Sequence, residues 1–184
     1  AKPVLSTSRY YPYSNDLVHI IGYVGEASID DIKKNKKIEE NFVPGLKVGK
    51  IGIENSSDQI LIGNYGIKRY EVNSSGKKIR EISYKKETQG ENLRTTIDLE
   101  VQRLAQKLLD NKAGSICAMD IYNGEIIALA SSPTYDPNKF TYGINKKDWH
   151  EIKNNKLRPL INKSIAGLYS PGSTIKPLVA LAAL

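Results

Sequence analysis

The chain of 184 residues has little of the residue types that dominate disulfide-rich, metal-binding and histidine-dependent proteins. Its one cysteine, Cys117, excludes an intramolecular disulfide and a cysteine-rich zinc site. Cys117 lies in an apolar run, so we expect it to be a small buried side chain. The two histidines, His19 and His150, are far apart and lack a carboxylate pattern, so nothing supports a metal centre or a Ser-His-Asp triad. We therefore expect no cofactor and no metal.

Long apolar runs are also missing. No run approaches the ~20 residues that a membrane-spanning helix needs, and no signal-peptide pattern follows Ala1. The formal net charge is +7, and the densest basic run, 33–37, lies between acidic residues. A run of this kind is typical of a solvated loop or helix face. Because no module of basic and aromatic residues accompanies it, we expect no nucleic-acid partner.

The residues that are present indicate two folded units. Residues 84–92 are polar and contain a glycine, which is typical of a linker, so we place a boundary between 1–92 and 93–184. In the first unit, the β-branched residues of 17–24 predict a strand. A hairpin is predicted further along, with strands at 65–72 and 77–84.

The second unit contains stronger local signals. Asp98 is a candidate N-cap for a helix. Its apolar face is expected to consist of leucines, namely Leu99, Leu104, Leu108 and Leu109. The pair Asn123-Gly124 predicts a hairpin between strands at 116–121 and 125–130. A short helix is expected at 146–153 and a last helix near Ser173.

Ser173 and Lys176 form a Ser-x-x-Lys motif, the nucleophile signature of penicillin-interacting acyl-transfer enzymes. A serine hydroxyl is a weak nucleophile that needs a base, and residues three apart share one face of a helix. The spacing alone is weak, because Ser83 and Lys86 have it as well. The later match follows a Pro-Gly turn and precedes an apolar helix, whose Pro177 is tolerated only in the first turn. The alternative at this point is a helix-capping serine and a solvated lysine.

Four stretches together are more specific than this motif. They are 158–177, with Gly167-Leu168-Tyr169 and Pro171-Gly172-Ser173-Thr174-Ile175-Lys176-Pro177; Arg9-Tyr10-Tyr11-Pro12-Tyr13 followed by 19–25; Gly49-Lys50-Ile51-Gly52-Ile53-Glu54; and Thr96-Ile97-Asp98-Leu99-Glu100-Val101-Gln102. In this order they resemble the class B penicillin-binding proteins, and among these the elongation-specific penicillin-binding protein 2 group.

The resemblance implies an α+β fold, with a penicillin-binding protein dimerisation (pedestal) domain over 1–92 and the N-terminal part of a transpeptidase domain over 93–184. It implies that the helix of Ser173 is buried against a central sheet. It also implies a peptidoglycan D,D-transpeptidase, in which Ser173 attacks a stem peptide ending in D-Ala-D-Ala and Lys176 takes the proton of the hydroxyl. β-Lactams would acylate the same serine. Burial or a nearby cation would have to lower the pKa of Lys176 for this role.

The resemblance further implies a place on the periplasmic side of the bacterial inner membrane, anchored by a transmembrane helix upstream of Ala1. The implied partners are peptidoglycan stem peptides, β-lactams and other proteins of the cell-wall elongation complex, with a homo-oligomer as an option. In the family, a Ser-x-Asn and a Lys-Thr-Gly motif complete the site. We expect both after Leu184, so these 184 residues by themselves are expected to be inactive.

Two other interpretations stay open. One is a non-catalytic scaffold domain for protein–protein interaction in the elongation machinery. The other is a penicillin-recognising hydrolase or sensor, which shares the Ser-x-x-Lys motif. The first ~90 residues argue against the hydrolase or sensor, because those proteins lack an appended domain with this sequence.

Overall fold

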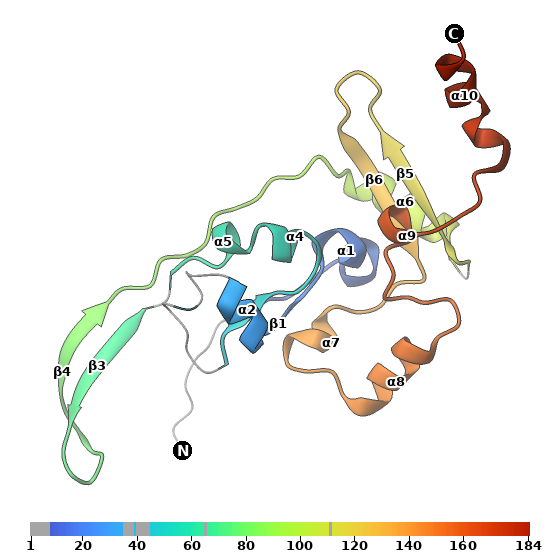
Figure 1. Ribbon diagram of the computed structural model, residues 1–184. Helices are drawn as coiled ribbons and strands as arrows, with labels where there is room; N and C mark the ends of the chain where they lie inside the picture. The colour runs from blue at the N-terminus through green and yellow to red at the C-terminus, as the bar shows by residue number, and fades with distance from the viewer. Residues whose placement is uncertain (1–7, 35–38, 40–44, 65, 111) are drawn as a thin grey trace.

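The computed structural model describes residues 8–184 apart from 35–38, 40–44, 65 and 111. A packed centre separates two projecting ends, a long hairpin at one end and the C-terminal helix at the other (Figure 1). The first half contains these elements: α1 (Ser14–Ile21), β1 (Val24–Glu26), α2 (Ile29–Lys34), β2 (Lys47–Gly49), α4 (Gly52–Ser56), α5 (Asp58–Leu61), β3 (Ile67–Val72) and β4 (Lys78–Lys85). The second half contains α6 (Leu99–Leu108), β5 (Gly114–Met119), β6 (Ile126–Ser132), α7 (Asn138–Thr141), α8 (Lys146–Asn154), α9 (Lys163–Ala166), η1 (Gly172–Ile175) and α10 (Lys176–Ala182).

Helix α1 replaces the strand predicted at 17–24, so that prediction was wrong. The helix ends at Gly22, whose φ of 81° is a backbone conformation that glycine adopts readily. Only the short strand β1 follows, and it pairs with β2 in antiparallel register. The β-branched residues favour a strand locally, but the helix buries Val18 to 1% exposure in the core. Tertiary burial therefore overrides local propensity here.

Both predicted hairpins are confirmed. Strands β3 and β4 pair around a loop in which the Asn73 side chain accepts hydrogen bonds from the backbone N–H groups of Ser75 and Lys77. Strands β5 and β6 pair around the Asn123-Gly124 turn, where Gly124 has a φ of 76°. The β5–β6 hairpin packs against α6 and α9, whereas the β3–β4 hairpin projects from the body of the chain (Figure 1).

Helix α6 begins as predicted but buries only part of the predicted leucine face, of which Leu109 lies in the core. The Asp98 carboxylate accepts hydrogen bonds from the N–H groups of Glu100 and Val101, at 2.9 and 3.0 Å, so the cap is confirmed. Leu104 and Leu108 are exposed, however. The buried face of the helix carries Gln102 instead, with Ala105 one turn further on. The polar side chain of Gln102 thus takes the place on the buried face that the prediction gave to Leu104 and Leu108.

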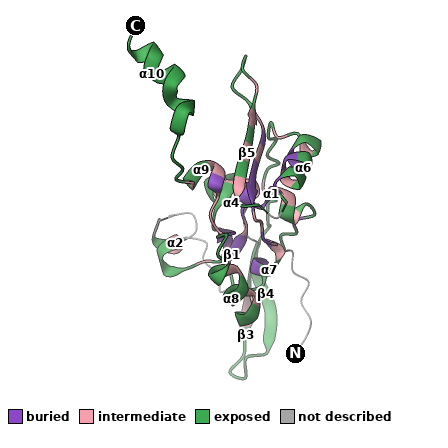
Figure 2. Cartoon of the chain, turned by 90° about the vertical axis from the view of Figure 1, so that its right-hand side faces the viewer, coloured by how far each residue is buried: buried purple, intermediate pink, exposed green. Residues whose placement is uncertain are grey.

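The largest core cluster draws on both sides of the predicted boundary at 92. Val18 packs with Tyr135 and Phe140, and these are surrounded by partly buried apolar residues, namely Tyr23, Ile144, Ile152 and Leu160. The rings of Tyr23 and Phe140 stack with centroids 4.3 Å apart. The buried residues gather between α1, β1 and the β5–β6 hairpin (Figure 2). The boundary itself stays a prediction, but α1 shares its core with residues of the second half.

Cys117 is exposed, so the prediction of a buried thiol was wrong. Strand β5 alternates between half-buried and exposed residues, and Cys117 falls on the exposed side together with Ser115 and Met119. The apolar run around Cys117 is therefore the run of a strand with one covered face. In the described part of the chain, every helix is too short or too polar to cross a bilayer.

Candidate functional site

Ser173 and Lys176 lie in one short helical segment. Ser173 is the second residue of the 3₁₀ turn η1, and Lys176 is the first residue of α10, with Pro177 directly after it. This agrees with the expectation that Pro177 falls in the first helical turn. The hydroxyl of Ser173 and the ammonium of Lys176 have no hydrogen-bond or ion-pair partner among the described residues. The structure thus places the two residues on adjacent turns without joining their side chains.

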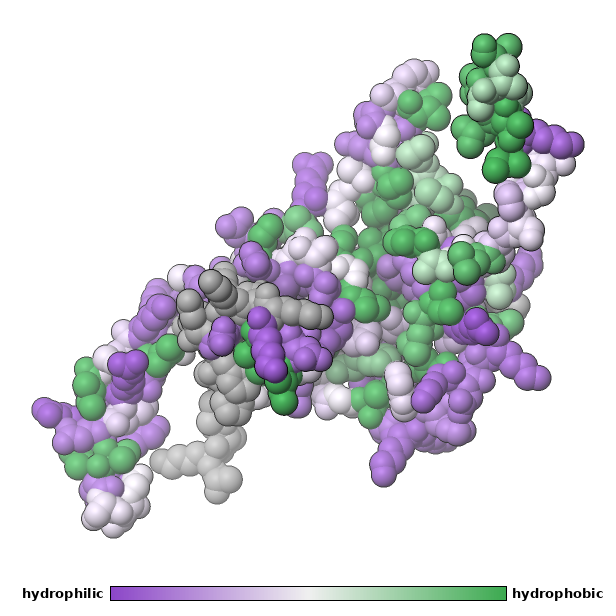
Figure 3. Space-filling model, in the orientation of Figure 1, coloured by the Kyte–Doolittle hydropathy of each residue, from purple (hydrophilic) through white to green (hydrophobic). Residues whose placement is uncertain are grey.

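The whole segment 168–184 is exposed to solvent. Helix α10 stands away from the packed centre, and its apolar side chains form a separate group at one end of the molecule (Figure 3). These side chains are Leu178, Val179, Leu181 and Leu184, each more than half exposed. The helix of Ser173 is therefore not buried against the β5–β6 hairpin, contrary to what the resemblance implied.

Helix α9, which precedes this segment, is held firmly to β6. The hydroxyl of Ser131 accepts a hydrogen bond from the N–H of Lys163 at 2.9 Å, and the hydroxyl of Ser164 donates to the carbonyl of Ala130 at 2.9 Å. The side chain of Asn162 caps the helix and also donates to the carbonyl of His19 on α1 at 2.9 Å. The chain that leads to Ser173 therefore starts from a helix that hydrogen bonds hold to the packed centre.

Two titratable side chains where α9 meets α1, Lys163 and His19, are buried. The ammonium of Lys163 donates to the carbonyl of Arg158 at 3.1 Å, and burial lowers its pKa. Burial is also the main cause that lowers the pKa of His19, and the positive charge of Lys163 acts in the same direction. A ring nitrogen of His19 lies 3.4 Å from the carbonyl of Pro133, which works against this shift. The sequence offered His19 only as a candidate for a metal centre or a triad, which it did not support, and it gave no signal for Lys163.

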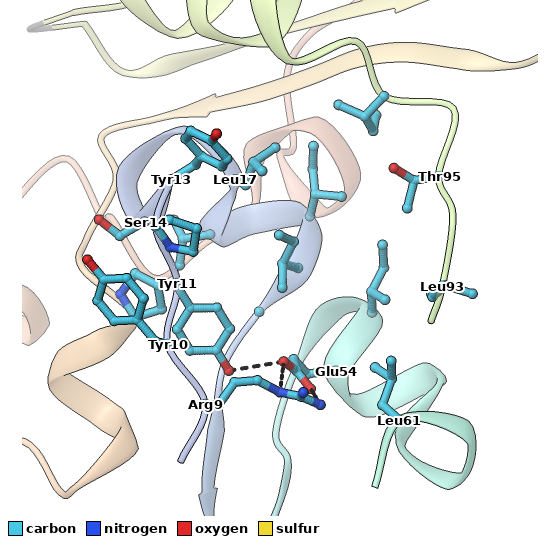
Figure 4. Close-up of a pocket in the computed structure, with 18 of the residues that line it drawn as sticks. Arg9, Tyr10, Tyr11, Tyr13, Ser14, Leu17, Glu54, Leu61, Leu93 and Thr95 are labelled. Carbon is cyan, nitrogen blue, oxygen red and sulfur yellow. Dashed lines mark hydrogen bonds and ion pairs between the residues drawn. The ribbon is translucent and has the colours of Figure 1, made fainter. Parts of the chain in front are cut away.

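The structure also has a half-open cavity of about 440 Å³ beside α1. Its lining is mostly apolar and comes from the segment 9–22, from α4 and α5, from residues 91–99 and from Pro137. Ser173 and Lys176 are not part of it. At one end Arg9 holds the buried carboxylate of Glu54 through two contacts of 2.8 and 3.2 Å, and the hydroxyl of Tyr11 donates to the same carboxylate at 3.2 Å (Figure 4). At this end of the cavity, the positive charge of Arg9 is paired with the negative charge of Glu54, so the pair serves the structure.

The glycines before Glu54 explain why the backbone can reach this position. A Cβ at Gly49 would lie 1.9 Å from the carbonyl oxygen of Glu54, and Gly52 has a φ of 61° beside the end of α1. Only glycine allows such close approach of backbone to backbone. The glycine-rich segment 49–54 thus serves packing between β2, α4 and α1. Among the described residues, no group of three or more His, Cys, Asp or Glu side chains is arranged to hold a metal ion.

Comparison with known protein families assigns both halves of the chain. Residues 2–95 match the penicillin-binding protein dimerisation domain. The chain belongs to the penicillin-binding protein family. Residues 114–184 match the penicillin-binding protein transpeptidase domain. Both matches confirm the mixed α+β assignment, with a dimerisation domain and part of a transpeptidase domain.

Individual penicillin-binding proteins resemble nearly the whole chain. The peptidoglycan D,D-transpeptidase MrdA of Acinetobacter baumannii is 39% identical over 178 residues, which are 96% of this chain and 26% of that protein. PBP2 of Helicobacter pylori, solved in complex with MreC, has a TM-score of 0.79 at 34% identity over 95% of this chain and 32% of that one. PBP2 of Pseudomonas aeruginosa, solved with WCK 5153, has a TM-score of 0.81 at 33% identity, covering 100% of this chain and 36% of that one. The chain spans about a quarter to a third of these relatives.

Proposed function

We propose that this chain is part of a peptidoglycan D,D-transpeptidase of cell-wall elongation. The observation that carries the proposal is the continuous similarity of the chain to proteins named peptidoglycan D,D-transpeptidase, at 39% identity over 96% of its length. The Ser173-x-x-Lys176 motif lies within the matched transpeptidase region. Fold similarity alone would be a weak argument for activity, since function depends on the site. The nucleophile motif supplies the site residues.

In the proposed reaction, the hydroxyl oxygen of Ser173 attacks the penultimate carbonyl of a stem peptide that ends in D-Ala-D-Ala. The proton of the hydroxyl passes to the amine of Lys176. The peptide bond then breaks, and D-alanine leaves with a proton on its new amino group. An amino group of a second stem peptide attacks the resulting ester, which releases Ser173 and completes the cross-link. A β-lactam is proposed to acylate Ser173 by the same attack, with its ring opened and retained as the ester.

The same reasoning explains why these 184 residues are proposed to be unreactive by themselves. Acylation needs an activated base, donors for the developing oxyanion and groups that hold the substrate carboxylate. In the structure the Ser173 segment is exposed on all sides, so the neighbouring groups do not form a cleft around it. Loss of one oxyanion donor alone costs about 100- to 1000-fold in rate. Loss of substrate positioning costs more, because orientation contributes about 7–11 kcal/mol.

We further propose a location on the periplasmic side of the inner membrane, held by a membrane anchor elsewhere in the protein. The half that matches the dimerisation domain is proposed to bind another protein of the elongation complex. A solved relative supports this choice, since PBP2 of Helicobacter pylori is seen in complex with MreC. A scaffold role and a catalytic role are compatible, because they use different halves of the chain.

Labelling with a fluorescent penicillin tests the proposal. The full-length protein should become labelled, mass spectrometry should place the label on Ser173, and Ser173→Ala should abolish it. Lys176→Ala should retain binding and lose most of the rate, while Ser83→Ala is the matched control for the other Ser-x-x-Lys match. A full-length protein that is not labelled at Ser173 would contradict the proposed function. Rapid stoichiometric labelling of the 184-residue chain would contradict the argument about the exposed segment.

A further inference from the structure

Gln102 is the most deeply buried large side chain of α6, with 1% of its surface exposed. It is the last residue of the stretch 96–102, one of the four stretches that carry the family resemblance. A buried amide that lacks hydrogen-bond partners costs free energy, so its partners show which contacts it serves. In this structure the partners of Gln102 lie on two different elements.

The amide of Gln102 joins α1 to β6. Its Nε2 donates to the carbonyl of Asp16 on α1 at 2.8 Å and to the carbonyl of Leu129 on β6 at 3.2 Å. Its Oε1 accepts from the N–H of Leu129 at 2.8 Å. The side chain therefore pairs with Leu129 as a neighbouring strand would, and uses its remaining donor on the N-terminal helix. A neighbouring ion pair between Arg103 and Asp16, at 3.3 Å, supports the same junction from the surface.

Strand β6 connects Gln102 with α9. Directly after Leu129, the carbonyl of Ala130 and the hydroxyl of Ser131 hold α9 through Ser164 and Lys163. Residues 167–172 then connect α9 to Ser173. Gln102 is thus one of the buried contacts that set the position of α1 relative to the strand from which the Ser173 segment starts.

We propose that Gln102 is a positioning residue for the acylation of Ser173, because it fixes β6 and thereby α9 against α1. The proposal rests on the proposed function, since it concerns the reaction at Ser173. Gln102 does not touch the reacting atoms. Its effect is indirect, through the starting position of the segment that carries the nucleophile. Small displacements of such a segment reduce rates strongly, and about 1 Å costs on the order of 100-fold.

Three variants of the full-length protein test this. Gln102→Met keeps the size of the side chain and removes all three hydrogen bonds. It should lower the second-order rate of acylation by a fluorescent penicillin about tenfold or more. Leu46→Ala is the matched control for stability, because it removes a buried side chain from a separate core cluster that includes no residue of α1, β6 or α9. It should lower the melting temperature by a similar amount and leave the rate of acylation close to the wild-type value.

Gln102→Glu adds a second measurement, the pH dependence of the acylation rate, which would not change if Gln102 only stabilised the fold. A glutamic acid in its neutral form can donate one hydrogen bond and accept another, so it replaces part of the amide, whereas the ionised form only accepts. The site presents two carbonyl oxygens to it. The titratable or charged groups on the elements around it are Asp16 and His19 on α1 and Glu100, Arg103 and Lys107 on α6, while β6 has none. Burial beside carbonyl oxygens favours the neutral form and raises the pKa of this glutamate.

The ratio of the Gln102→Glu rate to the wild-type rate, taken at each pH from about 5 to about 9, should therefore rise as the pH falls. The ratio for Gln102→Met should stay flat. If wild-type protein is labelled at Ser173 and Gln102→Met is labelled at the same rate, the inference is overturned and the proposed function stands. A flat Gln102→Glu ratio, or equal losses of rate in Gln102→Met and Leu46→Ala, would also overturn the inference. Wild-type protein that is not labelled at Ser173 would overturn the proposed function itself. If Gln102→Met does not fold, the pH series on Gln102→Glu decides.

Discussion

Removal of one hydroxyl should show how strongly the N-terminal segment is tied to the rest of the chain. In Tyr11→Phe the ring stays in place, but two hydrogen bonds are lost. The hydroxyl of Tyr11 accepts from the backbone N–H of Val24 at 3.0 Å and donates to the carboxylate of Glu54 at 3.2 Å. Tyr11 and Glu54 are both buried, with 6% and 4% exposed. Water therefore cannot replace the lost partners without a rearrangement.

The magnitude follows from the two bonds. A hydrogen bond to a charged group contributes about 1.5–3 kcal/mol and a neutral one about 0.5–1.5 kcal/mol, and an unpaired buried N–H has its own cost. We expect Tyr11→Phe to lower the free energy of unfolding by about 2–4 kcal/mol. In a chain of this length each kcal/mol moves the melting temperature by about 2–4 °C, so the shift should be on the order of 10 °C.

Thermal unfolding followed by circular dichroism measures this shift, with Tyr10→Phe as the matched control. Tyr10 is the neighbouring residue and is 74% exposed, so its hydroxyl should contribute less than about 0.5 kcal/mol. Hydrogen exchange at the Val24 amide should be faster in Tyr11→Phe alone. Equal melting temperatures for Tyr11→Phe and wild type, or an equal loss in Tyr10→Phe, would refute the assignment of these bonds as stabilising.

Three further predictions concern other parts of the chain. Asp98→Ala removes the cap of α6 and should cost about 1 kcal/mol in a urea titration, whereas Asp98→Ser should retain most of the stability; equal losses would contradict the capping role. Because the pKa of His19 in the folded chain lies below its ordinary value of 6.5, its contribution to stability is present above pH 6.5 and is lost as the pH falls through the lowered pKa. The free energy of unfolding, measured between about pH 7 and pH 4, should therefore fall with the pH, and it should fall less steeply in His19→Gln. In the 184-residue chain, Cys117 should react with a thiol reagent without denaturant, since its side chain is exposed; protection until unfolding would show that it is covered.

The sequence predicted elements well where the signal is a local backbone requirement. A cap needs an acceptor at one position, which Asp98 provides, and a tight hairpin needs residues that tolerate positive φ, which Asn123-Gly124 provides. Residues 17–24 were wrongly predicted as a strand because burial of Val18 against Tyr135 and Phe140 depends on residues more than a hundred positions away. The buried face of α6 likewise depends on residues outside the helix, because Gln102 forms hydrogen bonds with Asp16, 86 positions away, and with Leu129, 27 positions away.

The candidate site divides in a similar way. The Ser-x-x-Lys motif and the starting helix can be located from the residues themselves, because Pro177 fixes the first turn. The surroundings of Ser173 depend on side chains from other elements, and no local pattern encodes them. The junction of α1 with β6 and α9 had one sequence signal, a glutamine at a position where the leucine pattern leaves a gap on the buried face of α6.

Side-chain amides of the second half bind the backbone of the first half at three points. Asn138 both donates to and accepts from the backbone of Tyr11, Gln102 binds Asp16, and Asn162 binds His19. These contacts and the shared core do not require an intact chain at the exposed residues 91–96, which follow the end of the predicted linker 84–92 and lead to α6. If a protease cleaves this linker, the two pieces should therefore stay associated and migrate together in size-exclusion chromatography. Separately expressed pieces should reconstitute the α1 contacts by fragment complementation, so the junction behaves as an intramolecular interface rather than as a hinge.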